Sequence, residues 1–210
     1  MPHHAAPGKA VNSIPKIIYK QQHVGSNGRK FSPSRNAHYV QYIGEREHVL
    51  KPSHETNLVK YMGEREHAAK QSDNGLFGYI GGSFSDNYIT SEMQNYVRKI
   101  STSHRNVFHS IFSFTPESAE EAGLRTFGDW EEWVKFHISD ISRNMNMKLE
   151  NIEYLAAVHL KAGQPHVHIM WWDKAQEILI NRVNPAVCDQ IRIDAVSYTH
   201  LRAHETEADL

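Results

Sequence analysis

Three histidines in the second half of the chain have a spacing that could hold a metal ion. They lie in two β-rich segments, 154–161 and 166–173, which read as the strands of a hairpin. Residues two apart in a strand point to the same face, so His166 and His168 project together. If residues 162–165 form the loop, Pro165 stays out of the ladder, Lys161 pairs with His166, and His159 pairs with His168. All three imidazoles are then expected on one face of the hairpin.

Three neutral imidazoles leave coordination positions open, which is typical of a catalytic metal site and not of a closed structural one. We therefore predict a divalent metal ion bound by His159, His166 and His168. Imidazole accepts zinc, iron, nickel, manganese or copper, so these residues alone leave the identity of the metal open. The competing interpretation is that these are ordinary strand histidines that hold no metal.

Composition narrows the classes of protein that the chain can represent. The net charge of −1 argues against a protein that coats DNA non-specifically, although a basic channel on one face remains compatible with it. The single cysteine, Cys188, excludes an internal disulfide and a thiolate-rich zinc site. The chain has no apolar run long enough to span a bilayer and no signal-peptide core, so we expect a cytoplasmic protein without membrane insertion.

The elements that must position the histidines follow from periodicity and turn residues. The predicted fold is α+β, an antiparallel sheet of about five strands with helices packed on one face, the histidine hairpin at its centre and the first helix crossing the metal face. Further strands are expected at 14–24 and 107–115, and a Gly-rich loop at 73–85. Helices are expected at 37–50, 56–70, 89–100, 117–122, 130–147 and about 185–191.

The histidine motif resembles that of relaxases, which belong to the HUH endonuclease superfamily. His159 and, six positions later, Pro165-His166-Val167-His168 fit the relaxase pattern, proline included. Earlier segments resemble MobL-type plasmid mobilisation relaxases and occur in the same order over roughly residues 14–175. These segments are Tyr39, Tyr42, Ile43 and Arg46, then Tyr61 and Met62, then Gly75-Leu76-Phe77.

The resemblance implies an HUH relaxase-like fold and an enzyme that nicks single-stranded DNA at an origin of transfer during plasmid mobilisation or conjugation. In such enzymes a tyrosine attacks the phosphodiester with the help of a metal ion, and a 5′-phosphotyrosyl intermediate forms. For this chain we expect Mn²⁺ or Mg²⁺ first, with Zn²⁺ or Ni²⁺ as alternatives. On this chain the resemblance points to Tyr42 as the nucleophile, with Tyr39 second and Tyr61 third. The implied partners are origin-of-transfer DNA and other relaxosome proteins.

Several residues could contact the DNA. Arg46, one helical turn after Tyr42, could bind phosphate, although a surface ion pair with Glu45 is the alternative. Trp172 could share the histidine face and stack on a base. The remaining expected contacts, for which a solvated surface is the alternative, are Arg29, Lys30, Arg35 and Lys161.

One position departs from the relaxase pattern. Relaxases commonly carry an acid two positions after the first histidine, where this chain has Lys161. A carboxylate that orients a histidine must then come from elsewhere, for example from Asp173 or Glu153.

We expect three regions: a flexible arm at 1–13, the relaxase nuclease domain at 14–195, possibly truncated at its C-terminus, and a tail at 196–210. The tail resembles a translated sequencing adapter and is predicted to be non-native. Two alternative functions stay open: an HUH replication-initiator endonuclease, and a non-enzymatic single-stranded DNA-binding accessory protein. The tyrosines that precede the histidine motif favour the relaxase.

Overall fold

The computed structural model describes residues 16–22, 30–52, 74–103, 105–161, 163–177 and 183–208, with residues 161 and 198–208 described by their backbone alone. The predicted helix at 56–70, which carries Tyr61, lies outside the described residues. So does Arg29, one of the expected DNA contacts.

One antiparallel sheet forms the centre of the described fold. Its six strands follow the order β1-β4-β6-β5-β2-β3. The strands are β1 (Ile17–Gln22), β2 (Phe77–Ile80), β3 (Ser83–Ser85), β4 (Phe108–Phe114), β5 (Ile152–Lys161) and β6 (Gln164–Asp173). The predicted α+β class is confirmed, and the histidine hairpin, β5–β6, lies at the centre of the sheet as expected.

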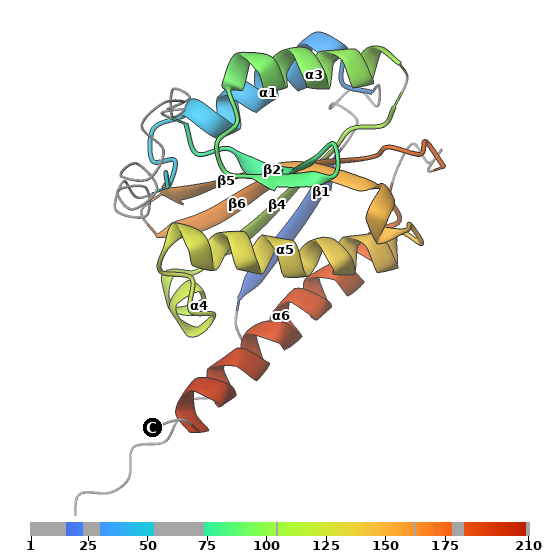
Figure 1. Cartoon of the computed structure of the whole chain (residues 1–210). Helices are drawn as coiled ribbons and strands as arrows, with labels where there is room; N and C mark the ends of the chain where they lie inside the picture. Colours follow the sequence, from blue (N-terminus) through green and yellow to red (C-terminus); the bar gives the residue numbers. More distant parts are fainter. Residues whose placement is uncertain are drawn as a thin grey trace, which may run out of the picture.

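Helices cover both faces of this sheet (Figure 1). One face carries α1 (Pro33–Glu45) and α3 (Thr90–Thr102), and the other carries α5 (Phe127–Asn144) and α6 (Pro185–Ala208). The short α4 (Pro116–Glu121) precedes α5, and a 3-10 turn (Leu149–Asn151) leads into β5. In the described part of the chain, no helix combines the length and the apolar character needed to cross a bilayer.

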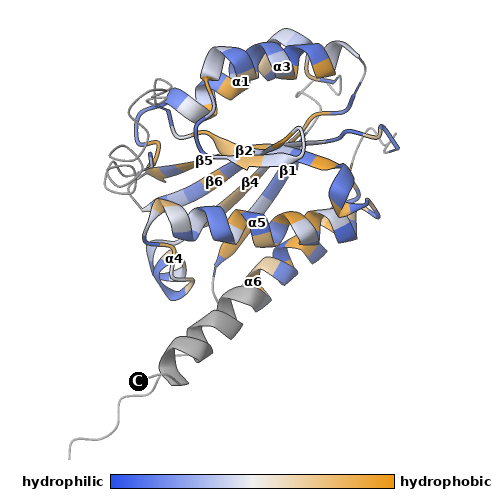
Figure 2. Cartoon of the chain, in the orientation of Figure 1, coloured by the Kyte–Doolittle hydropathy of each residue, from blue (hydrophilic) through white to orange (hydrophobic). Residues whose placement is uncertain are grey.

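The expectation of helices on one face only was wrong, because the central strands are apolar on both sides. The α5 side of the sheet buries Phe112, Trp133 and Trp171. The α1 side buries a second cluster that includes Val40 and Trp172. Figure 2 shows apolar residues of the helices turned toward the sheet. Both faces need cover, because each large buried side chain contributes roughly 1.5–3 kcal/mol that exposure would forfeit.

The register of the hairpin differs from the prediction by two residues. His159 pairs with His166, and Lys161 pairs with Gln164. The turn is shorter than expected, and Gly163 adopts the left-handed conformation there (φ 76). A shift of two residues leaves every side chain on the same face, so the predicted convergence of the histidines survives the wrong pairing.

Pro165 lies inside the ladder, opposite Leu160, and not in the loop. The Leu160 N–H points away from β6 and donates to the His48 carbonyl at 2.9 Å. The Leu160–Pro165 pair is therefore a non-hydrogen-bonded one, where the missing N–H of proline leaves no gap in the ladder.

Residues 77–85, which we expected to belong to a Gly-rich loop, form the β2–β3 hairpin. β2 pairs with β5 from Phe77 opposite Ala156 to Tyr79 opposite Tyr154. The buried Phe77 contributes to the α5-side core. The loop prediction failed because this strand is short and its apolar residues are flanked by glycines on both sides.

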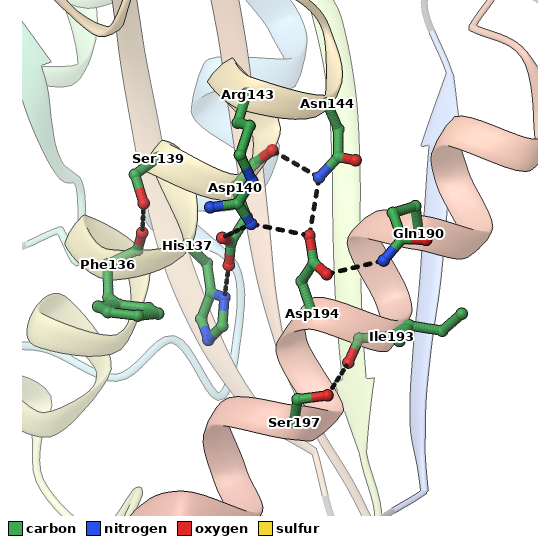
Figure 3. A network of polar contacts seen from close by, with 10 residues as sticks. All are labelled: Phe136, His137, Ser139, Asp140, Arg143, Asn144, Gln190, Ile193, Asp194 and Ser197. Atoms are coloured by element: carbon green, nitrogen blue, oxygen red, sulfur yellow. Dashed lines mark hydrogen bonds and ion pairs between the residues drawn. The ribbon is translucent and has the colours of Figure 1, made fainter.

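A polar network joins α6 to α5 (Figure 3). Asp194 of α6 accepts hydrogen bonds from Arg143 Nη2 at 3.0 Å and from Asn144 Nδ2 at 2.8 Å. Arg143 also donates to the buried Asp140 at 2.6 Å, and Asp140 lies 2.7 Å from His137 Nδ1. The network fixes the first half of α6 beneath the sheet.

α6 is much longer than the predicted helix at 185–191 and continues across the predicted domain end at residue 195. Ala195 is fully buried, and Val196 packs against the α5-side core. The non-native origin of residues 196–210 stays a prediction.

Candidate metal centre and its tyrosines

The three histidine side chains meet on the α1 face of the central hairpin. One ring nitrogen from each of His159, His166 and His168 lies within 4.8 Å of the others. Their ring centroids are separated by 4.6 to 5.1 Å. His159 and His168 are buried, and His166 is half-buried at the open side. Such a cluster can hold a divalent ion and leave positions for an outside ligand.

The hydrogen bonds of two histidines fix which nitrogen faces the centre. His159 Nε2 lies 2.9 Å from the Ile43 carbonyl, and His166 Nδ1 lies 2.8 Å from the Gln164 carbonyl. A carbonyl only accepts, so each of these nitrogens donates its hydrogen. The remaining nitrogens, Nδ1 of His159 and Nε2 of His166, then carry the lone pairs that a metal requires.

The third histidine is held by a tyrosine. His168 Nδ1 lies 2.8 Å from the Tyr39 hydroxyl. His168 Nε2 is buried without a hydrogen-bond partner among the described residues. A buried polar atom without a partner is costly, and a metal ion at this position would satisfy it. The donor set therefore fits a divalent ion without rearrangement of the hydrogen bonds.

Burial keeps two of the three rings neutral, which is the form that binds metal. Burial and the neighbouring His159 and His166 lower the pKa of His168 to about 2. Burial also lowers the pKa of His159, with His166 and Arg46 adding to the effect against the opposing Ile43 hydrogen bond. Protons therefore compete weakly with a metal at these rings.

The first helix, α1, is anchored at its start by a buried asparagine. Asn36 Oδ1 accepts a hydrogen bond from His109 Nε2 of β4 at 3.0 Å, and its Nδ2 donates to Ser101 Oγ of α3 at 3.0 Å. The Ser32 side chain caps the helix by accepting from the Arg35 N–H.

The end of α1 is anchored by its own carbonyls. The last carbonyls of a helix have no partner within it. Here the Ile43 carbonyl accepts from His159, and the Gly44 carbonyl accepts from the Gly75 N–H at 3.0 Å. A Cβ at Gly44 would lie 2.6 Å from Leu76 Cγ, so the absence of a side chain allows this close approach. With both ends fixed, the middle of the helix is held over the histidines.

Tyr42 is the accessible tyrosine of this helix. Its side chain is 42% exposed, and its ring centroid lies 6.2 Å from that of His159 and 5.9 Å from that of His168. Arg46 Nη1 donates to the Tyr42 hydroxyl, and the guanidinium carbon lies 4.7 Å from the ring centroid. A guanidinium at this place stabilises a phenolate and attracts phosphate.

Tyr39 is in a different situation. Burial raises its pKa above the ordinary tyrosine value, and the neighbouring Tyr42 adds to the rise. Its hydroxyl is engaged by His168 Nδ1. A buried, hydrogen-bonded hydroxyl of this kind is suited to orient the His168 ring. It is less suited to act as a nucleophile, which must lose its proton.

A stack of flat groups holds both tyrosines in place. It runs in the order Arg35, Phe31, His109, Tyr39, Tyr42 and Arg46. The angles between successive rings are 23°, 3° and 16°, and the closest centroids are 4.1 Å apart. Because the guanidinium groups cover the two end faces, the stack presents mainly ring edges to a ligand.

Beside the stack lies a cavity of about 290 Å³, which we call the tyrosine-side cavity. Among the described residues, its lining contains two cations and no carboxylate. The sheet contributes Lys20, Gln22, His109, Ile111 and His168, and the remaining lining residues are Phe31, Arg35, Tyr39 and Tyr42. The cavity therefore opens directly onto His168 of the histidine cluster and onto both tyrosines, with a positive rim.

The predicted DNA contacts fall in different places. Arg46 lies on Tyr42, while Glu45 accepts from Gln41 at 3.0 Å instead of pairing with the arginine. Arg35 lines the tyrosine-side cavity, and Lys30 lines a second cavity nearby. The backbone of Lys161 ends β5, and its side chain lies outside the described part.

Trp172 shares the histidine face, as expected, but it is fully buried at the far end of the hairpin. Its indole N–H donates to Glu153 Oε2 at 2.9 Å, and Tyr96 donates to the same oxygen at 2.9 Å. This burial does not support the expectation that Trp172 stacks on a base. Glu153 and Asp173 bond away from the histidines, since Asp173 accepts from the Ala175 N–H at 2.9 Å. The histidine rings instead form hydrogen bonds with the Tyr39 hydroxyl and with the Ile43 and Gln164 carbonyls.

Sequence reasoning missed two residues that shape the site. His109 stacks on Tyr39, and Asn36 links that histidine to α1. His109 could have been found from the alternation of side chains along β4. It lies two residues before Ile111, the pairing partner of His168, and therefore shares a face with it. Asn36 carried no signal, because its role depends on contacts distant in sequence.

The comparison with family models agrees with this geometry. The relaxase family model, described as the MobA/VirD2-like nuclease domain, matches residues 61–203, more than half of the chain. No curated protein and no solved structure matched the chain. The matched region contains the histidine hairpin and most of the sheet. The chain therefore belongs to the relaxase family of the HUH superfamily, as a MobA/VirD2-like nuclease domain.

Proposed function

We propose that this relaxase nicks single-stranded DNA at an origin of transfer through attack by Tyr42. The observation that carries the proposal is the position of an exposed tyrosine, with a guanidinium on its hydroxyl, beside three convergent histidines. A tyrosine hydroxyl has an ordinary pKa of about 10, so it needs a cation to stabilise the phenolate.

In the proposed step the Tyr42 oxygen bonds to the scissile phosphorus, and the bond from phosphorus to the 3′ oxygen breaks. The phenol proton passes to solvent on the exposed side of the ring. The departing 3′ oxygen takes a proton from solvent and becomes a free hydroxyl. The 5′ phosphate stays on Tyr42 as a phosphotyrosyl ester, so the reverse attack can rejoin the strand.

The chain's other residues bind and orient. His159, His166 and His168 would hold the divalent ion, which polarises the scissile phosphate when bound. Arg46 pairs with negative charge on the phenolate and on the phosphate. Tyr39 is a positioning residue that holds His168 through Nδ1.

The tyrosine-side cavity would take the nucleotide next to the scissile phosphate. Lys20 and Arg35 line it as cations, and Gln22 offers an amide that can donate to and accept from a base edge. The volume of about 290 Å³ matches a small-ligand pocket.

Covalent capture tests the proposal and identifies the DNA site in the same experiment. The Mn²⁺-loaded protein is incubated with a random-sequence single-stranded DNA library, denatured, and the protein-linked strands are sequenced. We expect strands that share one 5′ end, and no capture by Tyr42→Phe. Tyr96→Phe, which removes a hydroxyl on the same side of the sheet but remote from the histidines, should capture as the wild type does. Undiminished capture by Tyr42→Phe would refute the assignment.

We also propose the biological setting that this chemistry fits: plasmid mobilisation from the cytoplasm, within a relaxosome whose other proteins bring the origin to this domain.

A further inference from the structure

A second cavity lies between the start of α1, the end of α3 and the residues that lead into β4. Its volume is about 340 Å³. Its lining is largely polar and includes Lys30, Ser32, Asn36, Ser101, Thr102 and Arg105. We call it the α1/α3 pocket. It contains neither the histidines nor either tyrosine, so it is distinct from the site described above.

The α1/α3 pocket has the charge of an anion site. Lys30 and Arg105 are cations, and none of the described residues that line the pocket is a carboxylate. No ion pair joins either of them to an acid in the described part of the chain. Arg105 Nε is buried and has no hydrogen-bond partner among the described residues. A buried guanidinium donor without a partner is costly, and a phosphate oxygen would satisfy it.

The pocket lies next to the tyrosine-side cavity. Phe31 lines both cavities, and Asn36 lines the α1/α3 pocket while bonding to His109 of the stack. Four cations therefore line the two neighbouring cavities: Lys20 and Arg35 in the first, Lys30 and Arg105 in the second. Positive charge concentrated in this way is notable in a chain whose net charge is −1.

We propose that the α1/α3 pocket binds a backbone phosphate of the single-stranded DNA, beyond the nucleotide in the tyrosine-side cavity. Arg105 donates to the phosphate from inside the pocket, and Lys30 supplies charge at its entrance. Ser32, Ser101 and Thr102 add hydroxyl donors around it. The pocket sets the path of the strand and carries no sequence preference of its own. The proposal rests on the proposed function only in taking DNA as the ligand.

The salt dependence of DNA binding tests the proposal. Binding of a fluorescein-labelled oligothymidylate is measured by anisotropy at several salt concentrations, with a chelator present so that no strand is cut. Each phosphate contact to a single strand contributes about 0.7 to the slope of log K against log salt. Because both cations act on the same phosphate, Arg105→Ala should lower the slope by about 0.7, Lys30→Ala should lower it by less, and the double variant should lower it by about 0.7 in total.

Two further variants keep the test decisive. Arg98→Ala removes the same charge from an exposed position of α3 outside the pocket and should leave the slope unchanged. Arg105→Lys keeps the charge and should retain most of the slope, which also covers the case in which Arg105→Ala does not fold. Wild-type slopes in Lys30→Ala and Arg105→Ala, or an equal loss in Arg98→Ala, would overturn the proposal.

The outcome separates this proposal from the proposed function. If the protein never captures DNA covalently but the variants show reduced slopes, the phosphate pocket is supported and the nuclease assignment is refuted. If the protein captures DNA but the slopes of the Arg105→Ala and Lys30→Ala variants are unchanged, the nuclease assignment is supported and the phosphate pocket is refuted.

Discussion

Replacing Tyr39 by phenylalanine separates the two tyrosines of α1 by function. The substitution removes the hydroxyl that lies 2.8 Å from His168 Nδ1. The ring keeps its stacking on His109, at a centroid distance of 4.1 Å, so the packing should survive. The loss is confined to one hydrogen bond of one of the three histidines.

The size of the effect follows from that geometry. Removing the partner of a ligating histidine commonly weakens metal binding by about 10- to 100-fold. His159 and His166 keep their carbonyl partners, so we expect the lower end, about 10-fold or roughly 1.4 kcal/mol. At saturating metal, Tyr39→Phe should still nick DNA, because Tyr42 and Arg46 are untouched.

Mn²⁺ titration calorimetry measures the affinity, and nicking of the captured DNA sequence at saturating Mn²⁺ measures the chemistry. Tyr42→Phe should show the reverse pattern, with normal metal affinity and no nicking. Tyr96→Phe serves as the control that loses a remote hydroxyl on the same side of the sheet and should change neither. The reasoning is refuted if Tyr39→Phe abolishes nicking at every metal concentration, or if it leaves the Mn²⁺ affinity unchanged.

Two further predictions concern stability. Gly44→Ala places a Cβ 2.6 Å from Leu76 Cγ, so urea denaturation should show a loss of about 1–3 kcal/mol. Gly128→Ala, at an exposed helical position whose nearest neighbouring atom is 3.9 Å away, should be neutral or slightly stabilising; equal effects of the two variants would contradict the packing argument. Burial lowers the pKa of His137 despite its contact with Asp140, so the folded state keeps this ring neutral at pH values where the unfolded chain protonates it. Stability should therefore fall as the pH drops below about 6.5, by at most about 1.4 kcal/mol per pH unit for this group. The non-titrating His137→Gln variant should have a flatter pH profile of denaturation midpoints, and an equally steep profile would exclude His137 as a cause.

Local patterns in the sequence predicted most of the elements that carry the site. The alternation around His166 and His168 predicted the central hairpin and its shared face. That prediction tolerated a register error of two residues, because the side-chain period of a strand is also two. Helix periodicity and the Tyr-x-x-Tyr spacing placed both tyrosines on the helix that covers the histidines.

The remaining features depend on contacts between distant segments, which a single sequence does not reveal. The sequence suggested an acid as the orienting partner of a histidine, whereas Tyr39 and the carbonyls of Ile43 and Gln164 take that role. Trp172 lies on the predicted face of the sheet, but the packing of α3 against that face buries its side chain. Pairing of β2 with β5 was missed because Gly78 divides the apolar residues of this short strand, which leaves too little periodicity to distinguish a strand from a loop.

The site of covalent attachment tests the central claim most directly. Trypsin should release residues 36–46 as one peptide, NAHYVQYIGER, which contains both tyrosines of α1. Tandem mass spectrometry of the captured protein–DNA adduct, after nuclease trimming, locates the nucleotide on one residue. We predict that the fragment ions place it on Tyr42. An adduct on Tyr39, or on Tyr61 in the peptide 61–65, would contradict the account.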